Sequence, residues 1–346
     1  MSHAQTILTE AAIIRAEVDA LLSSGAPHSF CRFIFERLQI SEEQFVSYVK
    51  QCSKEFIQRI EKDVNGEISD LVPKISHRLW ITDPLEPHRP PLEYLEEISS
   101  ENLANDDWEN NFWTNSQLLM DFFSRYFADK GNSTRVRLLM DDFSGDPLLI
   151  ASEDFIASRK FVCASDIVRI MLLKKVGGFY ADLGVSCSRT MRELVSRATA
   201  AVNIDSQLMF QLAFLGFPKD SEFISFWYRI CVNPHIFTAA IYPAGERFDG
   251  EVELSMLSGP GFSAAVLLFL NQPASTLIVP QQGKHMQIKS QQSWYGSNAK
   301  FGNIIVSGTD STRLSSYLHD VTHASLLGMK QLGPREFLLK ATDTNP

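Results

Sequence analysis

The sequence predicts an α/β protein in which a mainly parallel, doubly wound central sheet follows an amino-terminal helical subdomain. Two observations favour this fold. Apolar residues recur at helical spacing up to about residue 70, and beyond Pro73 stretches with the period of a strand alternate with helical stretches. With 346 residues and 45% hydrophobic content, the chain is long enough to bury a full core. We expect a helical subdomain at residues 1–70 and a larger α/β domain at residues 71–346.

Composition excludes several classes of protein. The formal net charge is -9 and no long basic run is present, which argues against a sequence-independent nucleic-acid binder. The five cysteines are odd in number and form no C-x-x-C pair, so they fit neither a disulfide scaffold nor a zinc site. The amino terminus has no basic region before its apolar residues, and acidic residues interrupt them, so we expect no signal peptide and no transmembrane segment. These features favour a protein of the cytoplasm, or one delivered into another cell's cytosol.

The first 70 residues carry two helical patterns. Residues 6–24 show apolar positions at helical spacing, and Gly25 and Pro27 end the pattern. A second helix is predicted from Ser41, where Gln44 three residues later completes a capping box. Its apolar residues share one face: Phe45, Tyr48, Val49, Cys52, Phe56 and Ile60. Neither helix has a basic face, so we expect a cap that packs on the rest of the chain rather than a membrane-binding element.

Strands and helices alternate after Pro73. Residues 75–81 alternate between apolar and polar side chains, which predicts a strand, and residues 135–140 predict another. A helix is expected over residues 164–176, ended by Gly177 and Gly178 before a strand at residues 179–185. In sheets of this kind, ligands bind beyond the carboxyl ends of the strands.

The segment around this helix carries the polar groups. Ser165 is expected to cap the helix, and Asp166 and Arg169, three residues apart, are then neighbours on its first turn. The strand that follows ends at Asp182, at the rim of the sheet. Two acids and a base on an otherwise apolar scaffold predict a polar binding pocket.

The sequence ASDIVRIMLLKKVGGFYADLG resembles the signature of the DXD-containing glycosyltransferases, which include the sugar-binding-region family and the large clostridial glucosylating toxins. Four further motifs resemble that family in the same order along the chain: VPKISHRLWIT at residues 72–82, WENNFWT at 108–114, FLGFPKDSEF at 214–223 and LSGPGF at 257–262. The resemblance implies a glycosyltransferase A-type fold, a single Rossmann-like catalytic domain at residues 71–346 with a carboxyl-terminal lid region.

Carried over residue by residue, the resemblance implies a donor site. Trp80 stacks on the nucleobase, Asp166 and Arg169 hold the hydroxyls of the ribose and the sugar, and Tyr180 lines the pocket. Asp182 meets the ribose or a metal ion, and Arg169 and Asp182 are the expected catalytic residues. Simpler interpretations remain open, because a tryptophan in a strand is often a core residue and Asp166 with Arg169 can form a surface ion pair.

The motif departs from the family where its second aspartate belongs. This chain reads Asp182-Leu183-Gly184, and losing a carboxylate is expected to weaken the binding of Mn2+ or Mg2+ beside a diphosphate. Three explanations remain open: either another residue supplies a metal ligand, or cationic side chains alone neutralise the diphosphate, or the transfer activity has been lost.

The carboxyl-terminal region offers further candidates. Ser293 and Trp294 suit a lid that closes over the donor. The resemblance places a late histidine near the diphosphate, which makes His323 a candidate metal ligand, with Asp310 and Asp320 as alternatives.

Two functions of different classes follow. The first is a retaining hexosyl- or N-acetylhexosaminyltransferase that uses a nucleotide diphosphate sugar, expected to be uridine-linked, and modifies an acceptor expected to be a protein. The resemblance to toxins favours a bacterial effector. The second is a degenerate member that binds a nucleotide sugar or a partner protein without transfer. A dinucleotide-dependent oxidoreductase is disfavoured, because no G-x-G-x-x-G follows the first strand.

Overall fold

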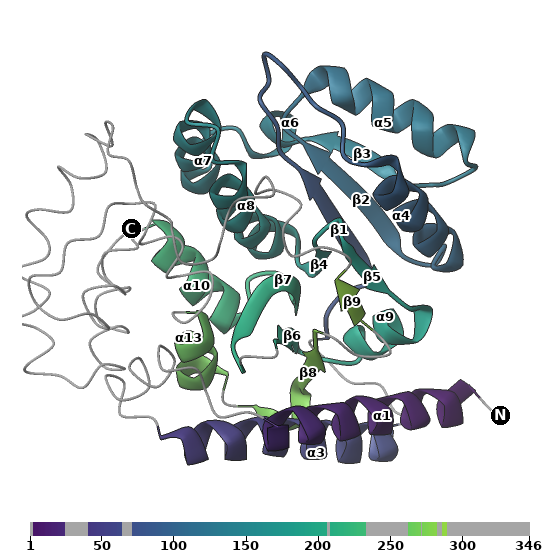
Figure 1. Cartoon of the computed structure of the whole chain (residues 1–346), viewed down its shortest axis with the longest axis vertical. Coiled ribbons are helices and arrows are strands. Elements are labelled where there is room, and N and C mark those ends of the chain that lie inside the picture. The colour runs from purple at the N-terminus through teal and green to yellow at the C-terminus, as the bar shows by residue number, and fades with distance from the viewer. Residues whose placement is uncertain are drawn as a thin grey trace, which may run out of the picture.

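The computed structural model describes residues 3–24, 41–63, 71–205, 208–232, 262–270, 272–281 and 286–288. A seven-stranded sheet of order β3-β2-β1-β4-β7-β6-β8 forms its centre (Figure 1). Within this sheet β7 alone runs against the other strands, which confirms the mainly parallel α/β fold. The strands are β1 (Ile75–Trp80), β2 (Glu109–Thr114), β3 (Arg135–Leu138), β4 (Gly178–Ala181), β6 (Ala200–Ile204), β7 (Phe210–Phe217) and β8 (Thr276–Pro280).

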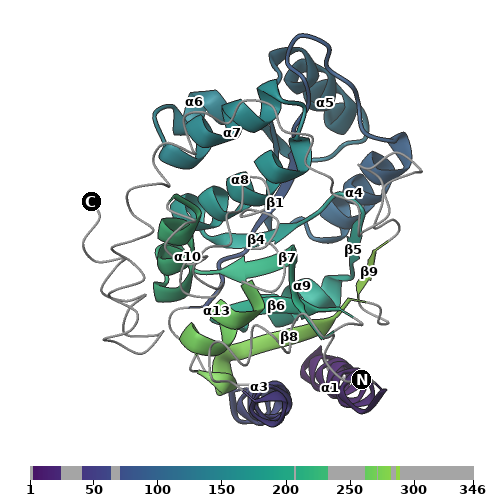
Figure 2. The same cartoon turned by 60° about the vertical axis from the view of Figure 1, so that its left-hand side comes forward.

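Helices cover both faces of the sheet (Figure 2). Helix α8 packs on β1, β4 and β7, with α7 and α10 against its outer side, and α5 packs on β2 and β3. A separate two-stranded sheet pairs β5 (Val185–Cys187) with β9 (Met286–Ile288). The helices after residue 71 are α4 (Leu92–Ala104), α5 (Gln117–Asp129), α6 (Leu139–Phe143), α7 (Pro147–Ala157), α8 (Phe161–Val176), α9 (Arg189–Val195), α10 (Glu222–Val232), α13 (Phe262–Phe269) and the 3-10 helix η2 (Pro273–Ser275). Among the described residues, none of the helices has the length and apolar content that a membrane span requires.

Helices α1 (His3–Ser24) and α3 (Glu42–Asp63) lie side by side along the β8 edge of the sheet (Figure 1). The capping box is confirmed, because the Gln44 N–H donates to Ser41 Oγ at 3.1 Å and the Ser41 N–H donates to Gln44 Oε1 at 2.6 Å. The apolar faces of both helices join the same hydrophobic core as the sheet, through buried residues that include Val18, Phe45 and Phe56. The boundary of the subdomain at residue 70 stays a prediction.

Three predictions about local structure are wrong. Strand β3 ends at Leu138, and the next residues form α6, whose first turn carries Asp141 and Asp142, where carboxylates favour a helix amino terminus. Helix α8 begins at Phe161, so Ser165 lies in its second turn and does not cap it. The strand expected at residues 179–185 divides into β4 and β5, separated by a turn.

The pattern of alternation in the first strand also needs correction. Both faces of β1 are buried, including the polar side chains of Ser76 and Arg78, because helices cover a mainly parallel sheet on both sides. The glycine pair does end α8 as predicted. Gly177 and Gly178 have φ of +75° and +100°, and a Cβ on either would collide with backbone atoms of Lys219 or Ile75.

Candidate donor-sugar site

The predicted charged residues meet at the carboxyl end of β4. Asp166 and Arg169 lie one turn apart on α8, and Asp182 follows β4 directly. The Arg169 guanidinium bridges the two acids, with Nη2 at 2.8 Å from Asp166 Oδ1 and Nη1 at 3.2 Å from Asp182 Oδ1. The reversal at Gly177 and Gly178 makes this meeting possible, because it turns the chain back along α8.

Arg169 is held inside the protein. Its side chain is 5% exposed, against 16% for Asp166 and 35% for Asp182. Arg169 Nε donates to the carbonyl of Ser165 at 3.2 Å, and Nη1 donates to that of Leu212 at 2.8 Å. The guanidinium therefore lies behind the two carboxylates and fixes them, and it is not part of a solvated surface pair.

Tyr180 contacts both Asp182 and Arg169. Its hydroxyl donates to Asp182 Oδ1 at 2.8 Å, and its ring lies under the Arg169 guanidinium at 4.9 Å. The side chain is 1% exposed, so Tyr180 orients Asp182 from the core. Burial raises the pKa of Tyr180 well above its ordinary value, and the hydroxyl stays a hydrogen-bond donor.

The charge state of Arg169 is equally fixed. Burial lowers the pKa of Arg169, but the nearby charge of Asp182, followed by Tyr180 and Asp166, raises it by more. The group is a permanent cation. The site thus combines one buried positive charge with two carboxylates that retain access to solvent.

Asp182 opens a tight turn that contains the altered motif. The Asp182 N–H donates to the carbonyl of Ala213 at 2.9 Å, and the Val185 N–H donates back to the carbonyl of Asp182 at 2.9 Å. Both the Tyr180 hydroxyl and the Arg169 guanidinium use Oδ1 of Asp182. Oδ2 of Asp182 takes part in neither contact, and the side chain is 35% exposed.

Trp80 lies beside this turn. It ends β1, its Nε1 donates to the carbonyl of His88 at 2.7 Å, and its ring is half-buried. It packs against the hydrophobic cluster that includes Leu183 of the altered motif, together with Phe112 and Phe123. The tryptophan is therefore held in a fixed orientation next to Asp182 with part of its ring accessible.

The described residues offer a metal ion few ligands. Among them, no group of three or more histidine, cysteine, aspartate or glutamate side chains is arranged to hold a metal. Asp182 can supply one carboxylate oxygen, which fits an ion whose other ligands come from a diphosphate and water. Ser293, Trp294 and His323 lie outside the described residues, as do Asp310 and Asp320.

Sequence reasoning missed a second arginine at the same turn. Arg78 of β1 is 2% exposed, and its Nη1 donates to the backbone carbonyls of Asp182 and Val185. The signal was present, because an arginine inside a strand of a sheet covered on both faces must be buried and paired. The alternation across residues 75–81 pointed instead to a solvent-facing position.

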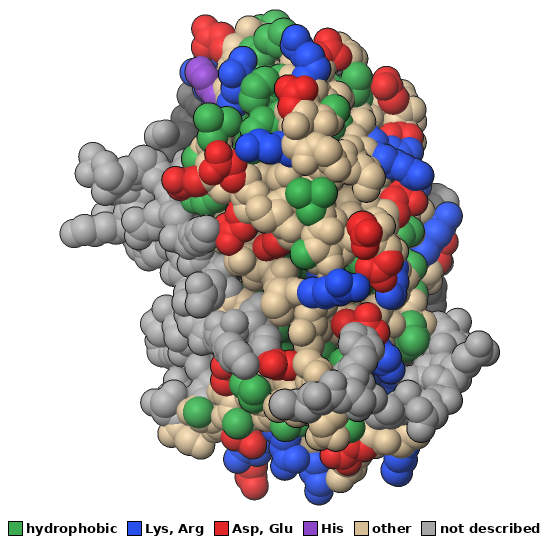
Figure 3. Space-filling model, turned by 90° about the vertical axis from the view of Figure 1, so that its right-hand side faces the viewer, with side chains coloured by type: hydrophobic (Ala, Val, Ile, Leu, Met, Phe, Trp, Pro, Cys, Tyr) green, Lys and Arg blue, Asp and Glu red, His purple; other side chains and the backbone are tan. Residues whose placement is uncertain are grey.

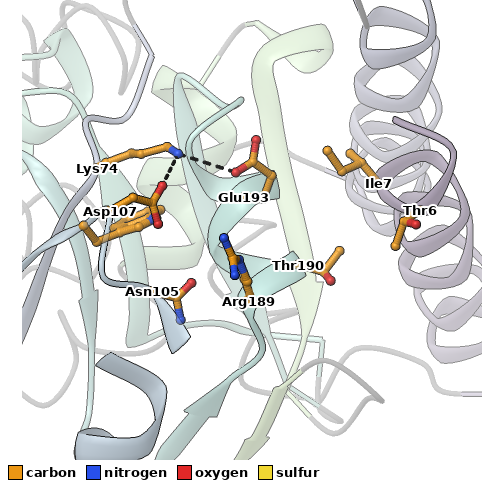
Figure 4. Close-up of a pocket in the computed structure, with 9 residues that line it drawn as sticks. Thr6, Ile7, Lys74, Asn105, Asp107, Arg189, Thr190 and Glu193 are labelled. Carbon is orange, nitrogen blue, oxygen red and sulfur yellow. Dashed lines mark hydrogen bonds and ion pairs between the residues drawn. The ribbon is translucent and has the colours of Figure 1, made fainter. Parts of the chain in front are cut away.

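A cavity lies at the opposite end of the sheet from this site. A cavity of about 600 Å3 opens at the amino ends of β1 and β2, between α1 and α9 (Figure 4). The Lys74 amino group sits there between Asp107 at 2.5 Å and Glu193 at 3.7 Å. Of the predicted donor residues that the structure describes, none lines this cavity, because Trp80, Asp166, Arg169, Tyr180 and Asp182 lie at the carboxyl end of the sheet.

The surface charges are mixed on the face shown in Figure 3, where acidic and basic side chains alternate without a continuous basic area. The net charge of the whole chain is -9.

The family model for the glycosyltransferase sugar-binding region containing the DXD motif matches residues 104–201. That span holds Asp166, Arg169, Tyr180 and Asp182. The match covers less than a third of the chain and supports the resemblance to the DXD-type glycosyltransferases over that segment. The matched segment reads Asp182-Leu183-Gly184 where the DXD motif has its two aspartates.

Two solved structures are similar to this chain. One is described as the PaToxG glycosyltransferase, with 16% identity, a TM-score of 0.45, and coverage of 88% of this chain and 96% of that chain. The other is the UDP-bound glycosyltransferase domain from the YGT toxin, with 11% identity, a TM-score of 0.40, and coverage of 66% and 83%. A comparison with curated proteins gives no match.

Proposed function

We propose that this protein transfers a hexose or N-acetylhexosamine from a uridine diphosphate sugar to a protein acceptor, with retention at the anomeric carbon. One observation carries the proposal. Inside the matched segment, a buried arginine presents two partly exposed carboxylates at the carboxyl end of β4, where ligands of such sheets bind. The uridine, the protein acceptor and retention rest on the resemblance of the motifs to the toxin glycosyltransferases, as does delivery into a host cytosol.

In this proposal the carboxylates contact the donor directly. Asp166 and Asp182 accept hydrogen bonds from hydroxyls of the sugar and the ribose, and the half-buried ring of Trp80 stacks on uracil. Arg169 acts through the acids, because most of its donor groups already bind Asp166, Asp182 and backbone carbonyls. Its role in the reaction is to hold both carboxylates in position.

The charge balance favours a metal ion. Arg169 is matched by two carboxylates, so the described site has no surplus positive charge to offset a diphosphate. We therefore propose that Mn2+ or Mg2+ accompanies the donor, with Oδ2 of Asp182 as a ligand and His323 as a further candidate. When bound, the ion stabilises the negative charge that develops on the departing diphosphate. Because the protein supplies few ligands, its affinity is low until the donor is present.

Gly184 favours a second candidate, a degenerate member that binds a nucleotide sugar or a partner protein without transfer. The two candidates share the binding site and differ in turnover. Loss of the second carboxylate weakens metal binding without altering Trp80 or Asp166, so a member of this kind can still bind the nucleotide sugar after it has lost transfer.

A donor panel separates these candidates. The protein is incubated with uridine diphosphate sugars and Mn2+, and hydrolysis is followed by nuclear magnetic resonance, which also reports the anomer released. We expect one sugar to be turned over with retention, and the Asp166→Asn and Arg169→Lys variants to stay folded and lose turnover, because lysine cannot bridge two carboxylates as the planar guanidinium does.

The Asp220→Asn variant is the matched control, since Asp220 pairs with Lys174 near the other end of α8. If no sugar turns over although the donor binds, the degenerate candidate replaces the first. Wild-type turnover in both site variants would place the donor site elsewhere.

A further inference from the structure

Arg78 and its partner Glu101 lie behind the turn that carries the altered motif. Arg78 Nη1 donates to the carbonyl of Asp182 at 2.6 Å and to that of Val185 at 2.8 Å, so one nitrogen joins both ends of the turn. The carbonyl of Asp182 also accepts the N–H of Val185, which closes the turn itself. The arginine is thus built into the backbone geometry of residues 182–185.

Glu101 of α4 completes this contact. Its Oε2 lies 2.6 Å from Arg78 Nη2, and its Oε1 accepts the N–H of Cys187 at 2.7 Å. Both side chains are nearly inaccessible, at 2% for Arg78 and 9% for Glu101. Together they bind three backbone groups of residues 182–187, on the side away from Arg169.

A buried ion pair adds little net stability to a hydrophobic core. Removing two charges from water carries a large desolvation penalty, and apolar residues of the same volume are often as stabilising. A charged pair does provide what apolar packing cannot, namely charge-assisted hydrogen bonds that fix the direction of backbone carbonyls. At this turn the carbonyls are those of Asp182 and Val185, so the contact fixes the backbone that carries the Asp182 carboxylate.

We propose that Arg78, paired with Glu101, is a positioning residue that holds the turn of residues 182–185 in its binding conformation before the donor arrives. The proposal deepens the proposed function and rests on it for the role of Asp182. With Gly184 in place of the second aspartate, a metal ion cannot order the turn by bridging two side chains. The pair of Arg78 and Glu101 orders the turn instead. Donor binding then does not carry the free-energy cost of ordering residues 182–185.

Hydrogen exchange tests the turn without reference to activity. In the Arg78→Gln variant, and more weakly in Arg78→Lys, the Val185 amide is expected to exchange at least about tenfold faster than in the wild type, because the turn opens locally. Arg192→Gln is the matched control. Arg192 is fully buried and lies 3.4 Å from Glu101, but its other bonds go to Asn110 and Asn102 and none goes to the turn.

Calorimetry with uridine diphosphate and Mn2+ provides the second readout. We expect the affinity to fall at least about tenfold in Arg78→Gln and to stay within about twofold of the wild type in Arg192→Gln, when both are corrected for the folded fraction. Arg78→Lys retains the buried charge, so this variant can be measured even if Arg78→Gln does not fold. We expect its affinity for uridine diphosphate to lie between those of Arg78→Gln and Arg192→Gln.

The two proposals fail in different ways. If the wild type does not bind uridine diphosphate, the proposed function is wrong and hydrogen exchange still decides the role of Arg78. If the Val185 amide of Arg78→Lys exchanges as slowly as in the wild type, or Arg192→Gln loosens it equally, the positioning role is refuted whatever the protein binds.

Discussion

Two arginine-carboxylate clusters hold Asp182 from opposite sides, and they differ in what they leave accessible. Arg169 binds the side chain of Asp182 and leaves both acids of its cluster partly exposed, at 16% for Asp166 and 35% for Asp182. Arg78 binds the backbone of the same residue, and its partner Glu101 is 9% exposed. We call Arg169 with its two acids the open cluster, and Arg78 with Glu101 the closed cluster. The open cluster leaves carboxylate surface accessible to a ligand, whereas the closed cluster has almost no accessible surface.

The largest effect is expected from removing charge in the open cluster. Asp182→Asn keeps the size of the side chain but removes the carboxylate that we assign to the metal and the ribose, so metal-stimulated transfer should fall by about a hundredfold or more. Steady-state kinetics with and without Mn2+ measures this. Asp220→Asn serves as the control, and equal activity of the two variants would remove Asp182 from the site.

Removing charge in the closed cluster should instead affect folding. Glu101→Gln leaves the buried cations Arg78 and Arg192 without their carboxylate, and breaking a buried pair of this kind costs about 3–5 kcal/mol. For Asp166→Asn, whose acid is partly solvated, we expect about 1 kcal/mol. Urea denaturation gives both values. If the two substitutions cost the same free energy of unfolding, the distinction between an open and a closed cluster is lost.

The neutral side chain of His77 makes the free energy of unfolding depend on pH. His77 of β1 accepts the Trp113 indole N–H on Nδ1 at 3.0 Å, so its Nε2 carries the proton and donates to the carbonyl of Gly177 at 2.7 Å. Burial lowers the pKa of His77 to about 4 from 6.5. The unfolded chain therefore binds a proton that the folded protein does not accept.

This stabilisation is complete above pH 6.5 and is lost as the pH falls toward 4, by about 3 kcal/mol at the lower limit. Unfolding free energies between pH 7 and pH 4 for the wild type and His77→Gln should show a steeper decline in the wild type. If the unfolding free energies of the wild type and His77→Gln fall in parallel between pH 7 and pH 4, a group other than His77 controls the loss of stability in acid.

A smaller effect concerns the aromatic edge of the open cluster. Trp80→Ala should weaken the binding of uridine diphosphate by about 1–3 kcal/mol, the range for lost base stacking. Trp108→Phe is a suitable control, because Trp108 is buried at the amino end of β2, far from this edge. Unchanged affinity in folded Trp80→Ala would return Trp80 to a purely structural role.

The open cluster could be predicted from the sequence because its residues are close in the chain. Asp166, Arg169, Tyr180 and Asp182 lie within one helix, a glycine reversal and one strand, so local patterns are enough to bring them together. The same reasoning failed at Ser165, because the apolar period of α8 did not reveal that the helix begins at Phe161.

The closed cluster depends on contacts that no local pattern encodes. Arg78 and Glu101 are separated by 23 residues, and Arg192 lies 91 residues from Glu101. Only the tertiary packing of α4 and α9 beside β1 brings them together. Alternation along β1 could not predict the burial of Arg78, because both faces of that strand are covered.

The most direct test of the whole account is calorimetry of the wild-type protein with a uridine diphosphate sugar, with and without Mn2+, alongside a hydrolysis assay on the same sample. We predict weak binding without the metal, tighter binding with it, and slow turnover of the bound donor. Absence of binding under both conditions would contradict the assignment of the Asp166, Arg169 and Asp182 cluster as a donor site.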